Sequence, residues 1–316
     1  MTKLTVVTYH YVRPIKHTKF YNLKGLELNI FKKQLIYLKK KFNIISYKDL
    51  IEIAQNKKKI IKNPCLLTFD DGYKDHIRFV LPELIKHKIK GCFFPSVYCV
   101  EKKKILNINK IHFILAKKIS ANNIFIELMK IIKNQKNNYY KKKYSTKNII
   151  KLKKKYKNNH RFDNKNVAFI KYLLQIYLPK KLRNICCDKL FKLFVSRKQK
   201  KFSENLYMST SDLKKLLKKG MYVGGHGYNH EHLNKLNFKE QKSEINKNYN
   251  FLKKINSPIR SWGMCYPHGS YNANTLKILK NKGCAFGFTT KKGNSNLVSS
   301  NFLELKRLDT NDIKLS

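Results

Sequence analysis

The chain has 316 residues, 42% of them hydrophobic, so it can bury a sizeable core and is not a globally disordered protein. Its formal net charge is +50, from 69 basic and 19 acidic residues, which taken alone suggests a nucleic acid or an anionic surface as partner. No run of about 18 apolar residues occurs, so we expect no membrane span.

Composition favours coding bias as the source of this charge. Nearly all the basic residues are Lys, and Arg occurs only at positions 13, 78, 161, 183, 197, 260 and 307. Lys, Asn and Ile are abundant together, as an A/T-rich coding sequence would produce, whereas nucleic-acid readers favour Arg for bidentate contacts. We therefore expect no specific nucleic acid partner, and a basic protein that binds nucleic acid or another polyanion is kept as an alternative.

The cysteines and the N-terminus indicate the compartment. Seven Cys are present without a CxxC pair, and most lie in apolar runs, which is typical of buried, reduced thiols. The first ten residues contain no long apolar stretch and no small-residue cleavage site. A cytoplasmic protein is the expectation.

Strand-like and helix-like patterns alternate through the first hundred residues. Strands are expected at 4–9, 43–46, 65–69 and 90–96, and helices at 30–41, 48–55 and 76–88. After residue 206 we expect helices at 210–219, 238–254 and 273–281, and strands at 221–225, 259–266, 284–290 and 302–308. This order predicts an α/β protein with a mainly parallel sheet and helices outside it.

The region between these two parts differs in composition. Lys, Asn and Tyr dominate 134–138 and 141–160, while amphipathic patterns occur at 111–132 and 167–195. We predict one barrel domain formed by 1–97 and 206–316, interrupted by a largely helical, Lys/Asn-rich insertion over 98–205 with one low-complexity segment. The insertion could be a lid, a substrate platform or a solvated spacer.

Polar side chains follow three of the predicted strands. Asp70 and Asp71 end one strand, His226 follows another with His230 four residues later, and Pro267-His268-Gly269 follows a third. Chemistry in α/β barrels lies at the carboxyl ends of the strands. One Asp and two His make a three-ligand metal set that leaves a position for water, and the second Asp is free to act as a base. Alone, the Asp-Gly pair would indicate a turn, and the two His would be structural.

These residues resemble the polysaccharide deacetylases of the NodB-homology type, carbohydrate esterase family four. The family's TFDDG motif stands intact at Thr68–Gly72, and its His-Ser/Thr-x-x-His motif is similar to His226–His230. The third motif ends in Pro-aromatic-Gly, and here reads Pro267-His268-Gly269. The resemblance covers about 1–97 and 206–309 and omits the insertion.

The resemblance implies a distorted (β/α) barrel that hydrolyses an N-acetyl group on a sugar or glycan precursor in surface-polysaccharide metabolism. Asp70 would be the general base, and the backbone N–H of His268 would bind the oxyanion. The metal ligands would be Asp71, His226 and His230. Oxygen and imidazole ligands suit zinc, with cobalt or manganese as alternatives.

The sequence departs from the family pattern in three places. Gly227 replaces a Ser or Thr, and Cys265 stands where many members have an Arg that steadies the base, a role that Arg307 could take. The late Leu-x-His motif that supplies the general acid is absent, and His10 is the preferred substitute, with His268 second. If neither acts, the chain would be a catalytically weak barrel that binds glycan.

Overall fold

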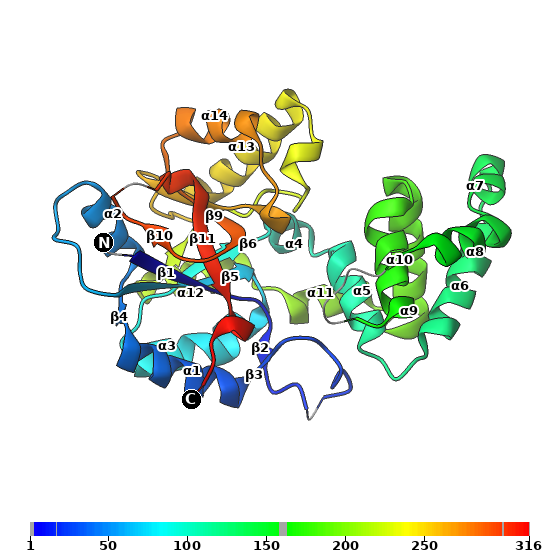
Figure 1. Ribbon diagram of the computed structural model, residues 1–316, viewed down its shortest axis with the longest axis horizontal. Coiled ribbons are helices and arrows are strands. Elements are labelled where there is room, and N and C mark those ends of the chain that lie inside the picture. Colours follow the sequence, from blue (N-terminus) through cyan, green and yellow to red (C-terminus); the bar gives the residue numbers. More distant parts are fainter. Residues whose placement is uncertain (1–2, 17, 158–162, 299, 316) are drawn as a thin grey trace. The chain divides into compact units, whose positions relative to one another are not determined.

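The computed structural model describes residues 3–16, 18–157, 163–298 and 300–315 (Figure 1). Two compact units are present. The barrel unit consists of Met1–Pro14, Gly25–Lys104 and Ser203–Ser316, and the helical unit consists of Ile15–Lys24 and Ile105–Phe202. The chain therefore leaves the barrel twice, once for a ten-residue segment and once for most of the region that differs in composition.

The barrel unit is built on a parallel sheet with the strand order β7-β6-β5-β1-β11-β9-β8. Gly225 joins the two ends of this order, because its N–H donates to the carbonyl of Gly263 at 2.9 Å and its carbonyl accepts from Cys265 at 2.8 Å. This confirms the predicted (β/α) barrel. The seven strands are β1 (Lys3–Tyr9), β5 (Pro64–Asp71), β6 (Cys92–Pro95), β7 (Tyr222–Val223), β8 (Trp262–Cys265), β9 (Cys284–Lys292) and β11 (Leu305–Asp309).

Among the described residues, four shorter strands and seven α-helices also belong to this unit. The short strands are β2 (Val12–Arg13), β3 (Leu26–Glu27), β4 (Asn43–Ile44) and β10 (Ser295–Asn296). The helices are α1 (Leu28–Lys41), α2 (Tyr47–Ala54), α3 (Leu81–Lys86), α4 (Val97–Lys102), α12 (Thr210–Lys218), α13 (Phe238–Lys254) and α14 (Ala273–Asn281). Asn237 and Glu240 form the reciprocal capping box that starts α13.

The barrel core explains why β5 reads as a continuous apolar run. All eight residues of β5 are buried, as expected for a central parallel strand covered on both faces. Phe69 stacks between Tyr9 and Phe93, with ring centroids 5.1 and 4.8 Å away. This packing fixes the end of β5, whose last two residues are Asp70 and Asp71.

Several element boundaries differ from the sequence prediction. The helix expected at 76–88 begins with a π-helical turn, His76–Val80, and ends at Lys86. The strand expected at 302–308 is a 3₁₀ turn over Phe302–Glu304 followed by β11. Regular pairing in β7 covers only Tyr222–Val223: Gly224 N–H still donates to the Phe93 carbonyl in β6, and Gly225 pairs with β8.

The helical unit has its own apolar core. Its helices are α5 (Asn107–Leu115), α6 (Ala121–Lys133), α7 (Asn138–Lys143), α8 (Thr146–Lys155), α9 (Lys165–Tyr172) and α10 (Lys180–Phe194). α11 (Gln199–Leu206) crosses the boundary to the barrel unit. α10 packs on α5 and α6, and the segment 15–24 joins this core through Phe20, whose ring lies 4.8 Å from that of Phe113.

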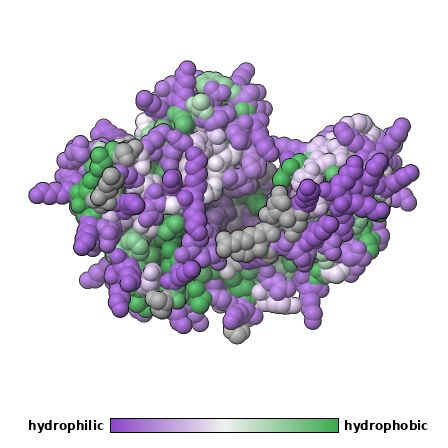
Figure 2. Space-filling view, viewed as in Figure 1, coloured by the Kyte–Doolittle hydropathy of each residue, from purple (hydrophilic) through white to green (hydrophobic). Residues whose placement is uncertain are grey.

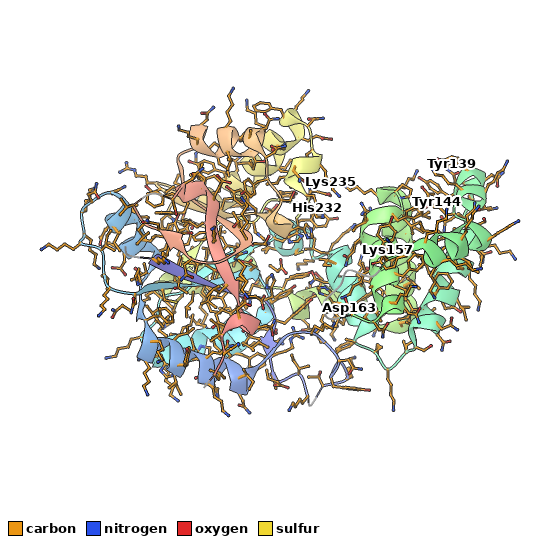
Figure 3. All side chains as sticks on the ribbon, in the orientation of Figure 1. Tyr139, Tyr144, Lys157, Asp163, His232 and Lys235 are labelled. Atoms are coloured by element: carbon orange, nitrogen blue, oxygen red, sulfur yellow. The ribbon has the colours of Figure 1, made fainter. Side chains whose placement is uncertain are left out.

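The low-complexity segment is more regular than its composition indicated. α7 and α8 occupy most of it. Tyr144, labelled in Figure 3, lies between them in the sequence, and its ring packs against that of Tyr177 with centroids 5.8 Å apart. Residues 158–160 lie outside the described residues. Hydrophilic side chains cover most of the visible face of both units (Figure 2). Among the helices of the described ranges, none has the length and apolar character needed to cross a bilayer.

Candidate functional site

The carboxyl ends of the barrel strands bring the sequence-predicted residues together. Asp70 and Asp71 end β5, His10 follows β1, and Arg307 lies in β11. His226 and His230 lie in the loop after β7, and His268 lies in the turn after β8. Residues that are more than two hundred positions apart in sequence therefore meet at one end of the barrel.

Asp71, His226 and His230 converge on one point. Oδ1 of Asp71 lies 3.3 Å from Nε2 of His226 and 3.2 Å from Nε2 of His230, and all three side chains are buried. Within the described residues, Oδ1 has no hydrogen bond of ordinary geometry. Burial alone would raise the pKa of Asp71, but the two imidazoles lower it well below its usual value. Two imidazole nitrogens that meet a carboxylate oxygen lacking an ordinary hydrogen bond form a set of three possible ligands that fits a divalent cation.

The orientation of His226 supports this fit. Its Nδ1 lies 2.8 Å from the carbonyl oxygen of Cys265, so Nδ1–H donates there and Nε2 faces Asp71. Ligand histidines in metal sites are usually fixed in this way by a backbone carbonyl.

Asp70 lies beside this trio in a different environment. One guanidinium nitrogen of Arg307 is 2.8 Å from its Oδ2 and 3.1 Å from its Oδ1, and the hydroxyl of Thr8 and the thiol of Cys265 each donate to Oδ2 at 3.3 Å. Burial would raise the pKa of Asp70, but the charge of Arg307 outweighs it and lowers the pKa. Asp70 is therefore ionised at neutral pH.

A second trio of possible ligands, Asp70, His226 and Cys265, is less suited to a cation. The guanidinium of Arg307 already supplies positive charge to Asp70, and the Cys265 thiol donates a hydrogen bond to the same carboxylate. Burial raises the pKa of Cys265, so the thiol keeps its proton. The two carboxylates therefore differ in their partners: that of Asp71 faces two imidazoles, and that of Asp70 is held by Arg307.

The two histidines considered as proton donors lie in different surroundings. Nε2 of His10 is 3.9 Å from Oδ2 of Asp70, and its side chain is about half exposed. His268 has a left-handed backbone, φ 57°, and its ring lies 4.4 Å from that of His230 and 4.0 Å from that of His232, which Figure 3 labels. The surrounding protein and these imidazoles lower the pKa of His268 far below its usual value.

Besides Thr8, two residues that the sequence did not single out contact the site or its loop. The Tyr73 hydroxyl donates to Oδ2 of Asp71 at 2.6 Å. Glu244, in α13, accepts hydrogen bonds from the backbone N–H groups of Tyr228 and Asn229 in the loop between the two histidines. Tyr73 directly follows Asp70-Asp71-Gly72, and this position could have indicated that it lies near the site. No local sequence pattern indicates that Glu244 would contact the loop.

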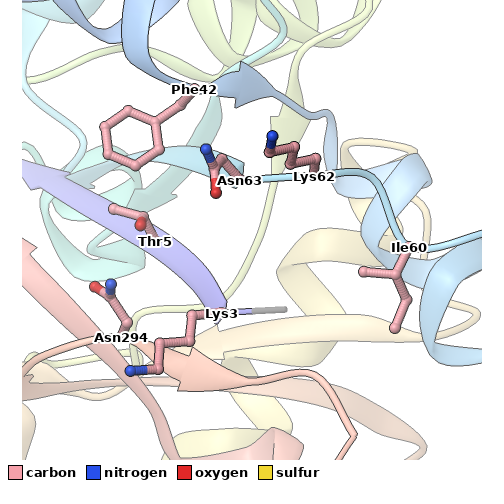
Figure 4. Close-up of a pocket in the computed structure, with 7 residues that line it drawn as sticks. All are labelled: Lys3, Thr5, Phe42, Ile60, Lys62, Asn63 and Asn294. Carbon is pink, nitrogen blue, oxygen red and sulfur yellow. The ribbon is translucent and has the colours of Figure 1, made fainter. Parts of the chain in front are cut away.

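A pocket of about 430 Å³ lies away from this site (Figure 4). It is lined by Lys3 at the start of β1 and by Lys62 and Asn63 just before β5, so it lies at the amino ends of the strands. None of the sequence-predicted site residues lines it.

Comparison with known proteins supports the fold and the family resemblance. Residues 193–287 match the polysaccharide deacetylase family model. The fold is similar to that of the deacetylase PplD from Streptococcus pyogenes, solved in complex with acetate (TM-score 0.59, 15% identity, 98% of this chain and 92% of that chain). It is also similar to that of a de-N-acetylase from Aggregatibacter actinomycetemcomitans (TM-score 0.57, 14% identity, 98% of this chain and 95% of that chain). A third similar structure is IcaB from Ammonifex degensii (TM-score 0.55, 16% identity, 98% of this chain and 91% of that chain).

No curated protein matches the sequence. The resemblance inferred from the motifs is nevertheless confirmed, because residues 193–287 match the polysaccharide deacetylase family model and the solved structures described above share the fold.

Proposed function

We propose that this chain, which has a polysaccharide deacetylase domain and the corresponding fold, is a metal-dependent hydrolase acting on an amino sugar or glycan precursor in surface-polysaccharide metabolism. It would remove the N-acetyl group as acetate. The observation that carries the proposal is the convergence of Asp71, His226 and His230 on one point beside the arginine-held carboxylate of Asp70.

Asp71, His226 and His230 would hold the metal, for which zinc is the first candidate and cobalt or manganese the alternatives. The chemistry that such an ion supplies is polarisation of the amide carbonyl and a lower pKa for a nearby water. The Nδ1 contact with the Cys265 carbonyl orients His226 so that its Nε2 faces Asp71, and both imidazoles lie against the ionised Asp71.

Asp70 has the environment of a general base. Its carboxylate is ionised and buried, and Arg307, Thr8 and Cys265 hold it in one orientation. In the proposed reaction it accepts a proton from the water that attacks the amide carbon. The backbone N–H of His268 would donate to the oxyanion that forms, and the left-handed turn at this residue sets the direction of that N–H.

His10 is better suited than His268 to protonate the departing nitrogen. It lies close to Asp70 at the end of β1 and is partly open to solvent, so a proton can pass between solvent, Asp70 and the amine. His268 is crowded by His230 and His232, and its lowered pKa leaves it neutral at neutral pH. We therefore assign the acid to His10 and the backbone role to His268.

The decisive experiment joins metal content to acetate release. Wild type should contain about one zinc-like ion per chain after reconstitution. Asp71→Ala and His226→Ala should fold but lose this ion, and Asp70→Asn should keep it and release no acetate from N-acetylated sugars. Acetate release that survives complete metal removal would contradict the mechanism. Bound metal without acetate release from any sugar would instead favour a glycan-binding barrel, the alternative motivated by the missing Leu-x-His motif.

A further inference from the structure

The backbone of Asp71 has an unusual conformation for a residue whose side chain must be held accurately. Its φ is 67°, in the left-handed region that costs a residue other than glycine about 1–2 kcal/mol. The next residue, Gly72, also has positive φ, and a Cβ there would meet Pro95 at 2.7 Å. This turn directs the Asp71 carboxylate toward His226 and His230, so the conformation must be stabilised by contacts elsewhere.

Tyr73 supplies such a contact on the far side of the carboxylate. Its hydroxyl donates to Oδ2 of Asp71 at 2.6 Å, while Oδ1 faces the two imidazoles. Both Tyr73 and Asp71 are buried, so water does not readily replace this donor. The hydrogen bond occupies one oxygen and leaves the other directed at the metal position.

The tyrosine is itself held from two sides. The ring of Tyr11, just after β1, stacks on Tyr73 with centroids 4.0 Å apart, and the ring of Tyr207 stacks at 5.9 Å. A backbone bridge between Tyr73 and Tyr207, and a hydrogen bond from Met208 N–H to the Gly72 carbonyl at 2.9 Å, fix the turn. The phenol therefore has little freedom to move away from Asp71.

We propose that Tyr73 is a positioning residue for metal binding, which makes Asp71 a one-oxygen ligand by holding its Oδ2. The inference rests on the proposed metal site, but it concerns the affinity of that site and does not depend on which sugar is hydrolysed. Without the phenol, Oδ2 would be buried without this donor and the carboxylate could rotate, so fewer molecules would present the ligand geometry. Loss of such an outer contact typically weakens metal binding about 10- to 100-fold.

The test measures the zinc dissociation constant of purified full-length protein by competition with a chromophoric chelator. Tyr73→Phe should bind zinc about 10- to 100-fold more weakly than wild type. Tyr207→Phe, which removes a buried phenol from the same stack but not from Asp71, should stay within about twofold of wild type. Tyr73→Met, which lacks the donor and fills the space differently, should show the same loss and serves if Tyr73→Phe is unstable.

The outcomes distinguish the role of Tyr73 from the existence of the metal site itself. If wild type binds zinc and both Tyr73 variants bind it equally tightly, the positioning role is wrong while the metal site stands. If folded wild type binds no zinc, cobalt or manganese, the metal site fails and the role of Tyr73 fails with it. A merely structural tyrosine would lower the melting temperature of the metal-free protein and leave the dissociation constant unchanged. The absorption spectrum of the cobalt-loaded variant, compared with that of wild type, reports any change in ligand geometry independently of turnover.

Discussion

Arg307 contacts both carboxylate oxygens of Asp70, at 2.8 and 3.1 Å, although the two residues are 237 positions apart in the sequence. Its Nε also donates to the carbonyl of Thr289 at 2.7 Å, so the guanidinium is anchored on the neighbouring strand β9. Both side chains are almost fully buried. The last strand of the barrel thus provides the charge that keeps the proposed base ionised.

Replacing Arg307 should cost more stability than replacing both partners. Arg307→Met leaves the Asp70 carboxylate buried without its cation, and breaking a buried pair in this way costs about 3–5 kcal/mol of unfolding free energy. Asp70→Asn in the same background should recover a large part of this loss, because no charge remains to be compensated. Urea unfolding of wild type, both single variants and the double variant gives the coupling energy. Strictly additive losses would show that the two side chains do not act as a pair.

Restoring the hydroxyl that the family usually has at position 227 should not help this protein. Gly227 has φ +64°, and a Cβ there would lie 3.2 Å from Cγ of Pro267. The loop is instead held by Glu244, which accepts from the N–H groups of Tyr228 and Asn229. Gly227→Ser should therefore lose about 1–2 kcal/mol of stability from the backbone alone, and it should also bind metal more weakly because the loop must shift.

Gly283→Ser is the matched control for that substitution. Gly283 has φ +67°, but nothing lies within 4 Å of the position of its Cβ. It should show the backbone cost without any change in metal affinity. Tighter metal binding by Gly227→Ser than by wild type would contradict this account of the loop.

The sequence predicted local features well and contacts between distant segments poorly. α13 and α14 begin and end where the caps and periodicity place them, because helix signals lie within a few residues. The approach of Asp71 to His226 followed from the rule that barrel strands end on one side. The hydrogen bonds of Tyr73 to Asp71 and of Glu244 to the backbone of the loop at Tyr228 depend on backbone turns, and hydrophobic periodicity carries no information about those turns. The helices α7 and α8 were obscured because Lys and Asn dominate their composition.

His10 provides a test of the proposed proton donor. His10→Gln should keep the metal and the fold but lower kcat by about 10²- to 10⁴-fold, the usual contribution of a positioned acid. His87→Gln, at the end of α3 and away from the site, is the matched control and should retain wild-type turnover. Turnover at the wild-type rate in His10→Gln, with bound metal confirmed by elemental analysis, would remove His10 from the mechanism.

The positive charge should produce only weak and non-specific attraction to polyanions. Two surface clusters carry equal charge: Lys39, Lys40 and Lys41 end α1, and Lys141, Lys142 and Lys143 end α7. If coding bias explains the charge, replacing either set by Ala should lower retention on heparin by the same amount, with a steep dependence on salt. A much larger effect of the α7 set would instead indicate a defined polyanion-binding surface on the helical unit.

His76 should make stability fall as the pH drops below neutrality. Its Nε2 lies 2.8 Å from the carbonyl of His10, so the neutral ring donates there, and within the described residues its buried Nδ1 has no hydrogen-bond partner. Burial lowers the pKa of His76 to about 4, below the ordinary value of about 6.5. The unfolded chain therefore binds the proton more readily, and the stability that neutral His76 contributes is present above pH 6.5 and is lost progressively toward pH 4.

From these two values, His76 alone should remove about 2 kcal/mol of unfolding free energy between pH 7.5 and pH 5. His76→Gln offers an amide N–H to the His10 carbonyl and does not titrate, so its stability should fall less over the same interval. Urea unfolding of wild type and variant at both pH values isolates the difference from all other titrating groups. Parallel losses in the two proteins would show that His76 is protonated as readily in the folded state as in the unfolded state.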